Sequence, residues 1–349
     1  MRHYRKYEKK GRARLKLTFG SKRLFACVSA AIAADFICLL SIHILPAFFL
    51  LSCSSAVAPA DESTPQTILV KSGAEAYGRT IDFLFFDDDP LGRLDSFSRI
   101  VCTDEGSSGT VCGSGRKIIA AISADGEDSY DYADIRDYRT LSAMERHLCD
   151  EDPSNPVLSG EARSGDAVIT IKPLLTKIRI NSLLADFRLH PYSGAVMEDV
   201  RIYLTNIPSS SPVLGVREAP PSSWLNLGGY FEEDAATLKH PEMIFSTTGN
   251  VGREVIFPSV ELYCYPSGIA EESFGSPMTK LVIEAMIDGE RWYYPILMKD
   301  LARGDLISMD ITFTGKGTQD PETPVSRENI IISTNIIPWT EKEPFTAIF

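Results

Sequence analysis

The sequence predicts an all-β protein with two β-sandwich domains and one short helix. Apolar and polar residues alternate with a period of two through many short segments, and turns rich in Gly, Pro and Asp separate those segments. A helical repeat stands out clearly in one segment. Many short strands joined by turns are typical of β-sandwiches.

The first domain begins with a strongly predicted strand. Ile81–Phe86 is rich in β-branched and aromatic residues, and the acidic stretch Asp87–Gly92 after it has the composition of a turn. Lys117–Ile122 is a short apolar run of the length expected for a buried strand. These segments place the first sandwich at residues 67–165.

The helix is expected at residues 137–148. Leu141, Met144 and Leu148 recur at i, i+3 and i+7, which predicts an amphipathic helix of about three turns. The helix should end before Pro153, because proline cannot continue the hydrogen-bond ladder.

The alternation returns near residue 165 and predicts a second sandwich at residues 166–349. In Thr176–Ile180 the isoleucines face one way and the cations the other. Ile307–Phe313 is a half-buried strand of period two. Asp288-Gly289, between two strand-like segments, suits the two φ > 0 positions of a type I′ turn and predicts a hairpin.

The amino-terminal segment has the three parts of a secretory signal. A basic start is followed by an apolar stretch that ends at Leu50-Leu51-Ser52-Cys53, and small polar residues come next. This exit resembles a bacterial lipobox, so we expect a signal peptide at 1–52, a lipid on Cys53 and a flexible tether at 53–66. The long basic start leaves room for a true translation start further downstream. The alternative is an uncleaved signal anchor in which Cys53 is an ordinary residue.

Removal of residues 1–52 makes the chain strongly acidic. That segment holds 10 of the 35 Lys and Arg residues and 2 of the 47 Asp and Glu residues, so 25 basic and 45 acidic side chains remain, a net charge of −20. Phosphate backbones would repel such a surface, which argues against nucleic-acid binding.

Two cysteines lie at the ends of neighbouring strand-like segments. Cys102 and Cys112 flank a Gly/Ser loop, so a disulfide between them is geometrically possible in an exported protein. Two buried thiols are the equal alternative.

The sequence contains no arrangement typical of a catalytic site, so we expect neither an enzyme nor a cofactor. It lacks a Gly-x-Ser-x-Gly elbow, a His-Glu-x-x-His motif and a phosphate-binding loop. The acidic runs Asp87–Asp89 and Asp125–Asp128 lack EF-hand spacing, and we interpret them as solvated turns rather than metal sites. Arg303-Gly304-Asp305 spells a tripeptide that some integrins recognise, but three residues often match by chance.

Several stretches together resemble the fimbrillin-like lipoproteins of Bacteroidales, which build type V pili. They occur in order along the chain: R-T-I-D-F-L-F-F-D-D-D (79–89), L-D-S-F (94–97), N-P-V-L-S-G-E (155–161), V-R-I-Y-L-T-N-I (200–207), K-L-V-I-E-A-M-I-D-G-E (280–290), D-I-T-F-T-G-K-G-T-Q-D-P-E-T-P-V (310–325) and P-W-T-E-K-E (338–343). The resemblance implies two transthyretin-like Greek-key β-sandwich domains. It also implies fimbrial subunits as partners, an outer-membrane location through the lipid and ligands on host or bacterial surfaces.

The resemblance further implies assembly by strand exchange. In stalk subunits an arginine-specific protease removes the first strand, and a neighbour's terminal strand fills the groove. Arg79 is the candidate cleavage site here, and cleavage would release Thr67–Val70. Retention of the lipid would instead suit an anchor subunit. The motifs favour a minor tip or accessory subunit.

A predicted strand near the carboxyl end is the candidate for donation to a neighbouring subunit. It carries a dense aliphatic run of Ile330, Ile331, Ile332, Ile336 and Ile337, which suggests a strand buried on both faces. This strand either completes its own sandwich or fills a neighbour's groove. The alternative function is a surface lipoprotein that does not polymerise and binds glycan or host protein. Trp224, Trp292 and Trp339 could stack on sugars, but three scattered tryptophans in a chain of this length are ordinary core usage.

Overall fold

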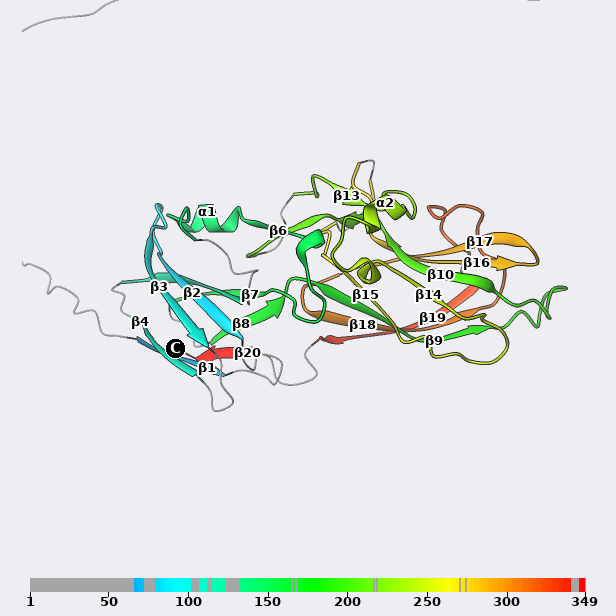
Figure 1. Cartoon of the computed structure of the whole chain (residues 1–349), viewed down its shortest axis with the longest axis horizontal. Coiled ribbons are helices and arrows are strands. Elements are labelled where there is room, and N and C mark those ends of the chain that lie inside the picture. Colours follow the sequence, from blue (N-terminus) through cyan, green and yellow to red (C-terminus); the bar gives the residue numbers. More distant parts are fainter. Residues whose placement is uncertain are drawn as a thin grey trace, which may run out of the picture. The chain divides into compact units, whose positions relative to one another are not determined.

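The computed structural model is built mostly of β-strands, with two very short α-helices in its described part (Figure 1). It describes residues 66–71, 79–101, 107–111, 115–123, 132–164, 166, 168–215, 217, 219–269, 271–273, 275–299, 301–339 and 345–348. Among these residues, no helix is long and apolar enough to span a membrane.

The first sheet has eight antiparallel strands in the order β3-β2-β5-β7-β8-β20-β1-β4. Their bounds are β1 Gln66–Lys71, β2 Thr80–Asp87, β3 Leu94–Val101, β4 Ser107–Val111, β5 Lys117–Ser123, β7 Leu158–Arg163, β8 Val168–Pro173 and β20 Phe345–Ile348. The expected strands at 81–86 and 117–122 are confirmed as β2 and β5.

Strands β2 and β5 are buried on both faces, as their continuous apolar sequences require. One face carries Phe83 and Ile119 into a small apolar cluster with β7 and β8. The other face carries Leu84 and Ile122 into the main core, which also contains Leu141. These two strands therefore join the small cluster to the main core.

Two four-stranded sheets contribute most of the remaining core. One has the order β15-β9-β18-β19 and the other β14-β10-β16-β17, and both line the main apolar cluster. Strands β9 and β18 run parallel, whereas their outer neighbours run antiparallel. The bounds are β9 Thr176–Ala185, β10 Glu198–Thr205, β14 Phe245–Thr248, β15 Val260–Cys264, β16 Lys280–Ile287, β17 Glu290–Leu297, β18 Asp305–Phe313 and β19 Ile330–Pro338.

Short elements make up the rest of the described secondary structure. The two-stranded pairs are β6 with β12 and β11 with β13. Their bounds, with those of the helical turns, are β6 Glu145–His147, β11 Ile207–Pro208, β12 Ser210–Pro212, β13 Trp224–Leu225, α1 Tyr138–Ser142, α2 Glu232–Ala235, η3 Leu148–Asp150 and η4 Pro241–Met243.

The predicted hairpin at Asp288-Gly289 is confirmed. Ile287 pairs with Glu290, which leaves a two-residue loop between β16 and β17. Asp288 has φ 53° and Gly289 has φ 77°, as a type I′ turn requires. The alternation of β18 is also confirmed, with Ile307, Met309 and Ile311 buried.

The predicted three-turn helix at 137–148 is wrong beyond its first turn. Asp137 caps α1 by accepting a hydrogen bond from the Thr140 amide at 2.7 Å, but the helix ends at Ser142. After Ala143 and Met144, residues 145–147 form β6, which pairs with β12. Leu141 and Leu148 are buried as expected. The tertiary strand pairing satisfies the backbone groups that a longer helix would have used.

The proposed domain boundary near residue 165 falls within the eight-stranded sheet. Strands β7 and β8 lie on either side of it and pair at Leu158↔Pro173 and Ser159↔Lys172. Strand β20, from the far end of the chain, also belongs to this sheet. The division into 67–165 and 166–349 stays a prediction.

Candidate strand-exchange site

The first strand of the described chain lies between two others in the eight-stranded sheet. β1 pairs with β4 over five positions, from Gln66↔Val111 to Val70↔Ser107. On its other side it pairs with β20 over three positions, from Leu69↔Ile348 to Lys71↔Thr346. Figure 1 shows the three strands side by side. Loss of β1 would expose the facing backbone edges of β4 and β20, which are a template for another strand.

Strand β20 comes from the last residues of the chain, and the sequence analysis did not identify it. Its other edge pairs with β8 over four positions, from Phe345↔Ile171 to Ile348↔Val168. Four residues give too short a pattern for a periodicity argument. The pairing with β1 joins residues near the two ends of the described chain, and no local signal encodes such a contact.

Arg79 directly precedes β2, whose first residue, Thr80, pairs with Val101. The half-buried guanidinium donates a hydrogen bond from Nη1 to the Pro156 carbonyl at 2.8 Å. A protease that cuts after Arg79 would first have to release this hydrogen bond. The cleavage itself stays a prediction.

Comparison with known proteins finds a match in the fold and none in the sequence. No family model matches the chain, and no curated protein matches it. A fimbrilin of Porphyromonas gingivalis matches with a TM-score of 0.51 at 13% identity, over 80% of this chain and 98% of that one. This chain has the fimbrilin fold. The resemblance predicted from the sequence is confirmed at this level.

Two further solved structures match this chain in fold. A "putative cell adhesion protein" of Parabacteroides distasonis matches with a TM-score of 0.55 at 12% identity, over 82% of this chain and 94% of that one. A second, from Bacteroides eggerthii, matches with a TM-score of 0.54 at 16% identity, over 75% and 89%. At sequence identities this low, the structural similarity shows a shared fold and nothing more.

In this fimbrilin-fold chain the candidate donor strand, β19, is an edge strand. It pairs with β18 over nine positions, from Asp305↔Pro338 to Phe313↔Ile330. The expectation that β19 is buried on both faces is wrong, because Ile331 is 60% and Ile336 50% exposed, whereas Ile330 is buried. Ile331 and Ile336 are five residues apart and therefore lie on opposite faces of the strand, so neither face of β19 is fully covered. Its role as a donor stays a prediction.

The three tryptophans are half-buried, and two of them, Trp292 and Trp339, pack against the main core. Trp339 packs against Tyr263, with ring centroids 5.5 Å apart. Trp292 lies below the Lys316 ammonium, 5.3 Å from the ring centroid. Trp224, in β13, is half-buried. The contacts of Trp292 and Trp339 occupy parts of the aromatic faces that a sugar ring would need.

The acidic triplet before Pro90 is engaged in ion pairs and a turn. Asp87 pairs with Lys117 at 2.5 Å, and Asp88 pairs with Arg163 at 2.9 Å. Asp89 accepts a hydrogen bond from the Gly92 amide at 2.7 Å. Three other predicted sites, Cys53, Cys102 and Cys112, lie outside the described residues, as does the run 125–128.

Proposed function

We propose that the chain is a structural or adhesive fimbrial subunit that assembles by exchange of β-strands. One observation carries the proposal: β1 is paired on both edges by short ladders, between β4 and β20. Its removal would leave a gap that an extended segment of a neighbouring subunit can fill, with backbone hydrogen bonds giving affinity. A head-to-tail contact of this kind builds an open filament.

The proposal includes export as an outer-membrane lipoprotein with the lipid on Cys53 and release of the first strand by cleavage after Arg79. It also includes two transthyretin-like Greek-key domains, at 67–165 and 166–349. A minor tip or accessory position suits the motifs, and an anchor position follows if the lipid is retained. The partners are other fimbrial subunits. The role needs no catalytic group and no cofactor.

Two truncations separate the candidate donor segments. A chain that ends at Trp339 lacks β20 alone, whereas a chain that ends at Asp320 lacks β19 as well. We expect the first to stay folded and to leave the fimbrial fraction, because β20 pairs over only three and four positions. We expect the second to unfold, because β19 pairs with β18 over nine positions and carries the buried Ile330.

Circular dichroism and co-purification with fimbriae are the two measurements. If the Trp339 truncation folds and still co-purifies with fimbriae, this end of the chain is not the joint. If the Asp320 truncation folds and only this truncation leaves the fimbrial fraction, β19 is the donor. If the intact chain never enters a fimbrial fraction, the alternative of a surface binder that does not polymerise replaces the proposal.

A further inference from the structure

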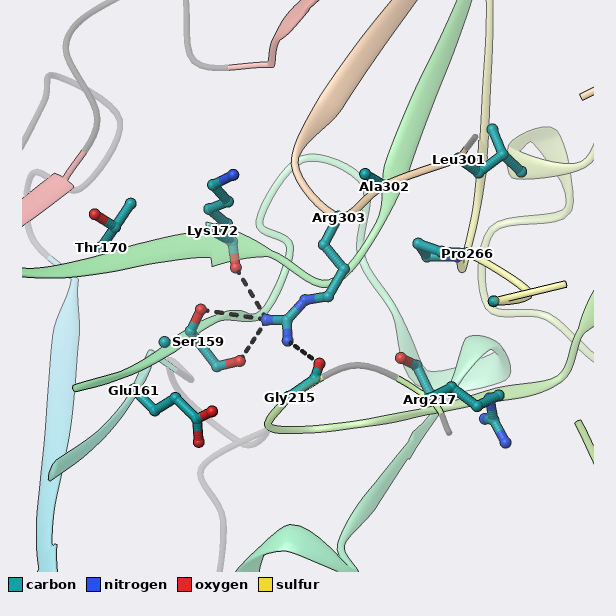
Figure 2. Close-up of a pocket in the computed structure, with 13 residues that line it drawn as sticks. Ser159, Glu161, Thr170, Lys172, Gly215, Arg217, Pro266, Leu301, Ala302 and Arg303 are labelled. Atoms are coloured by element: carbon teal, nitrogen blue, oxygen red, sulfur yellow. Dashed lines mark hydrogen bonds between the residues drawn. The ribbon is translucent and has the colours of Figure 1, made fainter. Parts of the chain in front are cut away.

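The Arg303 side chain fixes the loop that precedes β18. It lies in a pocket of about 380 Å³ beside that loop (Figure 2). Nη1 donates a hydrogen bond to the Gly215 carbonyl at 3.0 Å, and Nη2 donates to the Ser159 hydroxyl at 2.5 Å. Because these acceptors belong to the protein itself, the guanidinium ties the loop to β7 and to the segment after β12.

The same loop helps to hold β19 in place. The tripeptide Arg303-Gly304-Asp305 is packed rather than displayed, and the Gly304 carbonyl accepts a hydrogen bond from the Trp339 amide at 2.7 Å. Trp339 directly follows β19. At the other end of the strand, the Asn329 carbonyl accepts from the Thr314 amide at 2.9 Å. A strand that is fixed at both ends loses little further freedom when its open edge pairs with another strand.

The outer edge of β19 lacks the features that usually block an exposed strand. In the part of the chain that the structure describes, β19 is the last strand of its sheet, and no other strand pairs with this edge. Its ladder with β18 has no register shift, so β19 has no β-bulge. Residues 330–337 include no charged residue and no proline. Charges, prolines and bulges are the usual protection of an edge strand against pairing with another chain.

The other edge strands of the two four-stranded sheets have such protection. Strand β15 carries Glu261, and β17 carries Arg291 and Pro295. Strand β14 has only four residues. Since short length also limits pairing at an edge, β19 is the strand of these two sheets whose edge is best suited to another strand.

The residues along β19 form the same pattern in both directions. On either side of Thr334 the order is one polar residue and then two isoleucines: Ser333, Ile332 and Ile331 toward the start, and Asn335, Ile336 and Ile337 toward the end. When two copies of a strand pair antiparallel about a two-fold axis, one residue faces its own copy at the axis. If that residue is Thr334, every one of these isoleucines faces an isoleucine.

We propose that the outer edge of β19 binds the same edge of a second copy of this chain, antiparallel and centred on Thr334. The exposed Ile331 then faces Ile337 on one side of the joined sheet, and the exposed Ile336 faces Ile332 on the other. The four-stranded sheets of the two copies become one continuous sheet. Strand β19 stays in its own subunit, so this contact differs from strand exchange and does not rest on it.

The contact is weak when only two chains meet. One strand against another buries less than the roughly 1,000 Å² of a stable interface. The formal net charge of −12 also makes two copies repel each other. In dilute solution the chain therefore stays monomeric, and the pair is a minor species. Where the chain assembles as proposed above, two fibres side by side present many such edges, and many weak contacts together give a stable lateral association.

Disulfide trapping of the purified full chain in a glutathione redox buffer tests the proposal. Thr334→Cys should give a cross-linked dimer, because residues that face each other in an antiparallel pair have Cα atoms about 4.5 or 5.5 Å apart, within reach of a disulfide. Ser333→Cys is the matched control, at a site that is also exposed. It faces Asn335 and lies diagonally from its own copy, about 7–8 Å away, so we expect at least about fivefold less dimer.

Non-reducing electrophoresis measures the dimer, and the unsubstituted chain gives the background from the native cysteines. All variants carry Arg79→Gln, so that strand exchange after cleavage cannot begin. Ile336→Lys, added to Thr334→Cys, should lower the dimer yield by about fivefold or more, because a charge on the edge blocks pairing. Leu189→Lys, at a 96% exposed site outside β19, should leave the yield unchanged.

Three outcomes overturn the proposal. The first is a dimer yield from Thr334→Cys that does not exceed the background. The second is an equal yield from Thr334→Cys and Ser333→Cys, which would show random collision. The third is an equal effect of Ile336→Lys and Leu189→Lys. The test uses the uncut chain, so its failure leaves the strand-exchange proposal standing.

Discussion

Two sets of paired strands in this chain differ in the length of their ladders. In the β9–β18–β19 set, β18 pairs over eight positions on one edge and nine on the other. In the β20–β1–β4 set, β1 pairs over three positions and five. Ladder length and burial set how much free energy is needed to open an element locally. The comparison indicates that β1 is held by fewer backbone pairings than β18, as the proposed exchange of β1 requires.

The largest effect is expected in the core under the long ladders. Phe313, at the end of β18, is fully buried, and its ring centroid lies 4.6 Å from that of Tyr294. Phe313→Ala should lower the free energy of unfolding by about 3–5 kcal/mol, because it leaves a cavity. Phe257→Ala, at a 75% exposed site, should change it by less than about 0.5 kcal/mol. Urea denaturation measures both. If Phe313→Ala lowers the free energy of unfolding by less than about 1 kcal/mol, the long-ladder set is not the more stable of the two, and the comparison fails.

Hydrogen exchange compares the two sets directly. Amides of β1 and β20 should exchange about tenfold faster or more than those of β18, because the short ladders open locally. Mass spectrometry of peptides from the two regions gives the rates. If β1 is protected as strongly as β18, the difference in ladder length has no energetic meaning.

The smallest effect concerns an ion-pair cluster on β15 and β9. Burial alone would raise the pKa of Glu261, but hydrogen bonds and charges from Lys177 and Arg179 outweigh burial and lower it. The ion pairs measure 2.8 and 2.9 Å. A carboxyl whose pKa is lowered in the folded state stabilises the fold at any pH above its unfolded-state pKa. This contribution is lost as the pH falls through the folded-state pKa.

Glu261→Gln should therefore lower the free energy of unfolding at pH 7 by under about 1 kcal/mol, because the cluster is partly exposed. The difference between the two proteins should shrink as the pH falls below about 4, near the ordinary carboxyl value. Urea denaturation of both proteins at pH 7 and at acidic pH measures this difference in the free energy of unfolding. A difference that grows toward low pH would show that Glu261 is not held as an anion.

Local pattern predicted the parts of the fold that local interactions determine. The Asp288-Gly289 hairpin and the alternation of β18 required only turn geometry and a half-buried surface, and both are present. Leu141 and Leu148 were correctly predicted as core, but their helical spacing was misleading, since β12 pairs with the segment between them. Sequence spacing cannot show a partner strand more than sixty residues away.

The candidate sites depend on long-range contacts, so the sequence predicts them less well. Arg79 could be singled out because it precedes a clear strand, but the place of β1 between β20 and β4 could not be predicted. Arg303 was noticed only within a tripeptide. Its contacts with Ser159 and Gly215 come from elements far away in the chain, and they turn an apparent surface motif into the wall of a pocket.

The central claim is that β1 holds a place that a neighbouring subunit's strand can take. Native mass spectrometry of the full chain, before and after cleavage by an arginine-specific protease, tests it most directly, with Arg79→Gln as the uncleaved control. We predict that the intact chain and Arg79→Gln stay monomeric. The chain cut between Arg79 and Thr80 should lose its amino-terminal fragment and form head-to-tail oligomers. A cut chain that keeps the fragment and stays monomeric, or that unfolds, would contradict the claim.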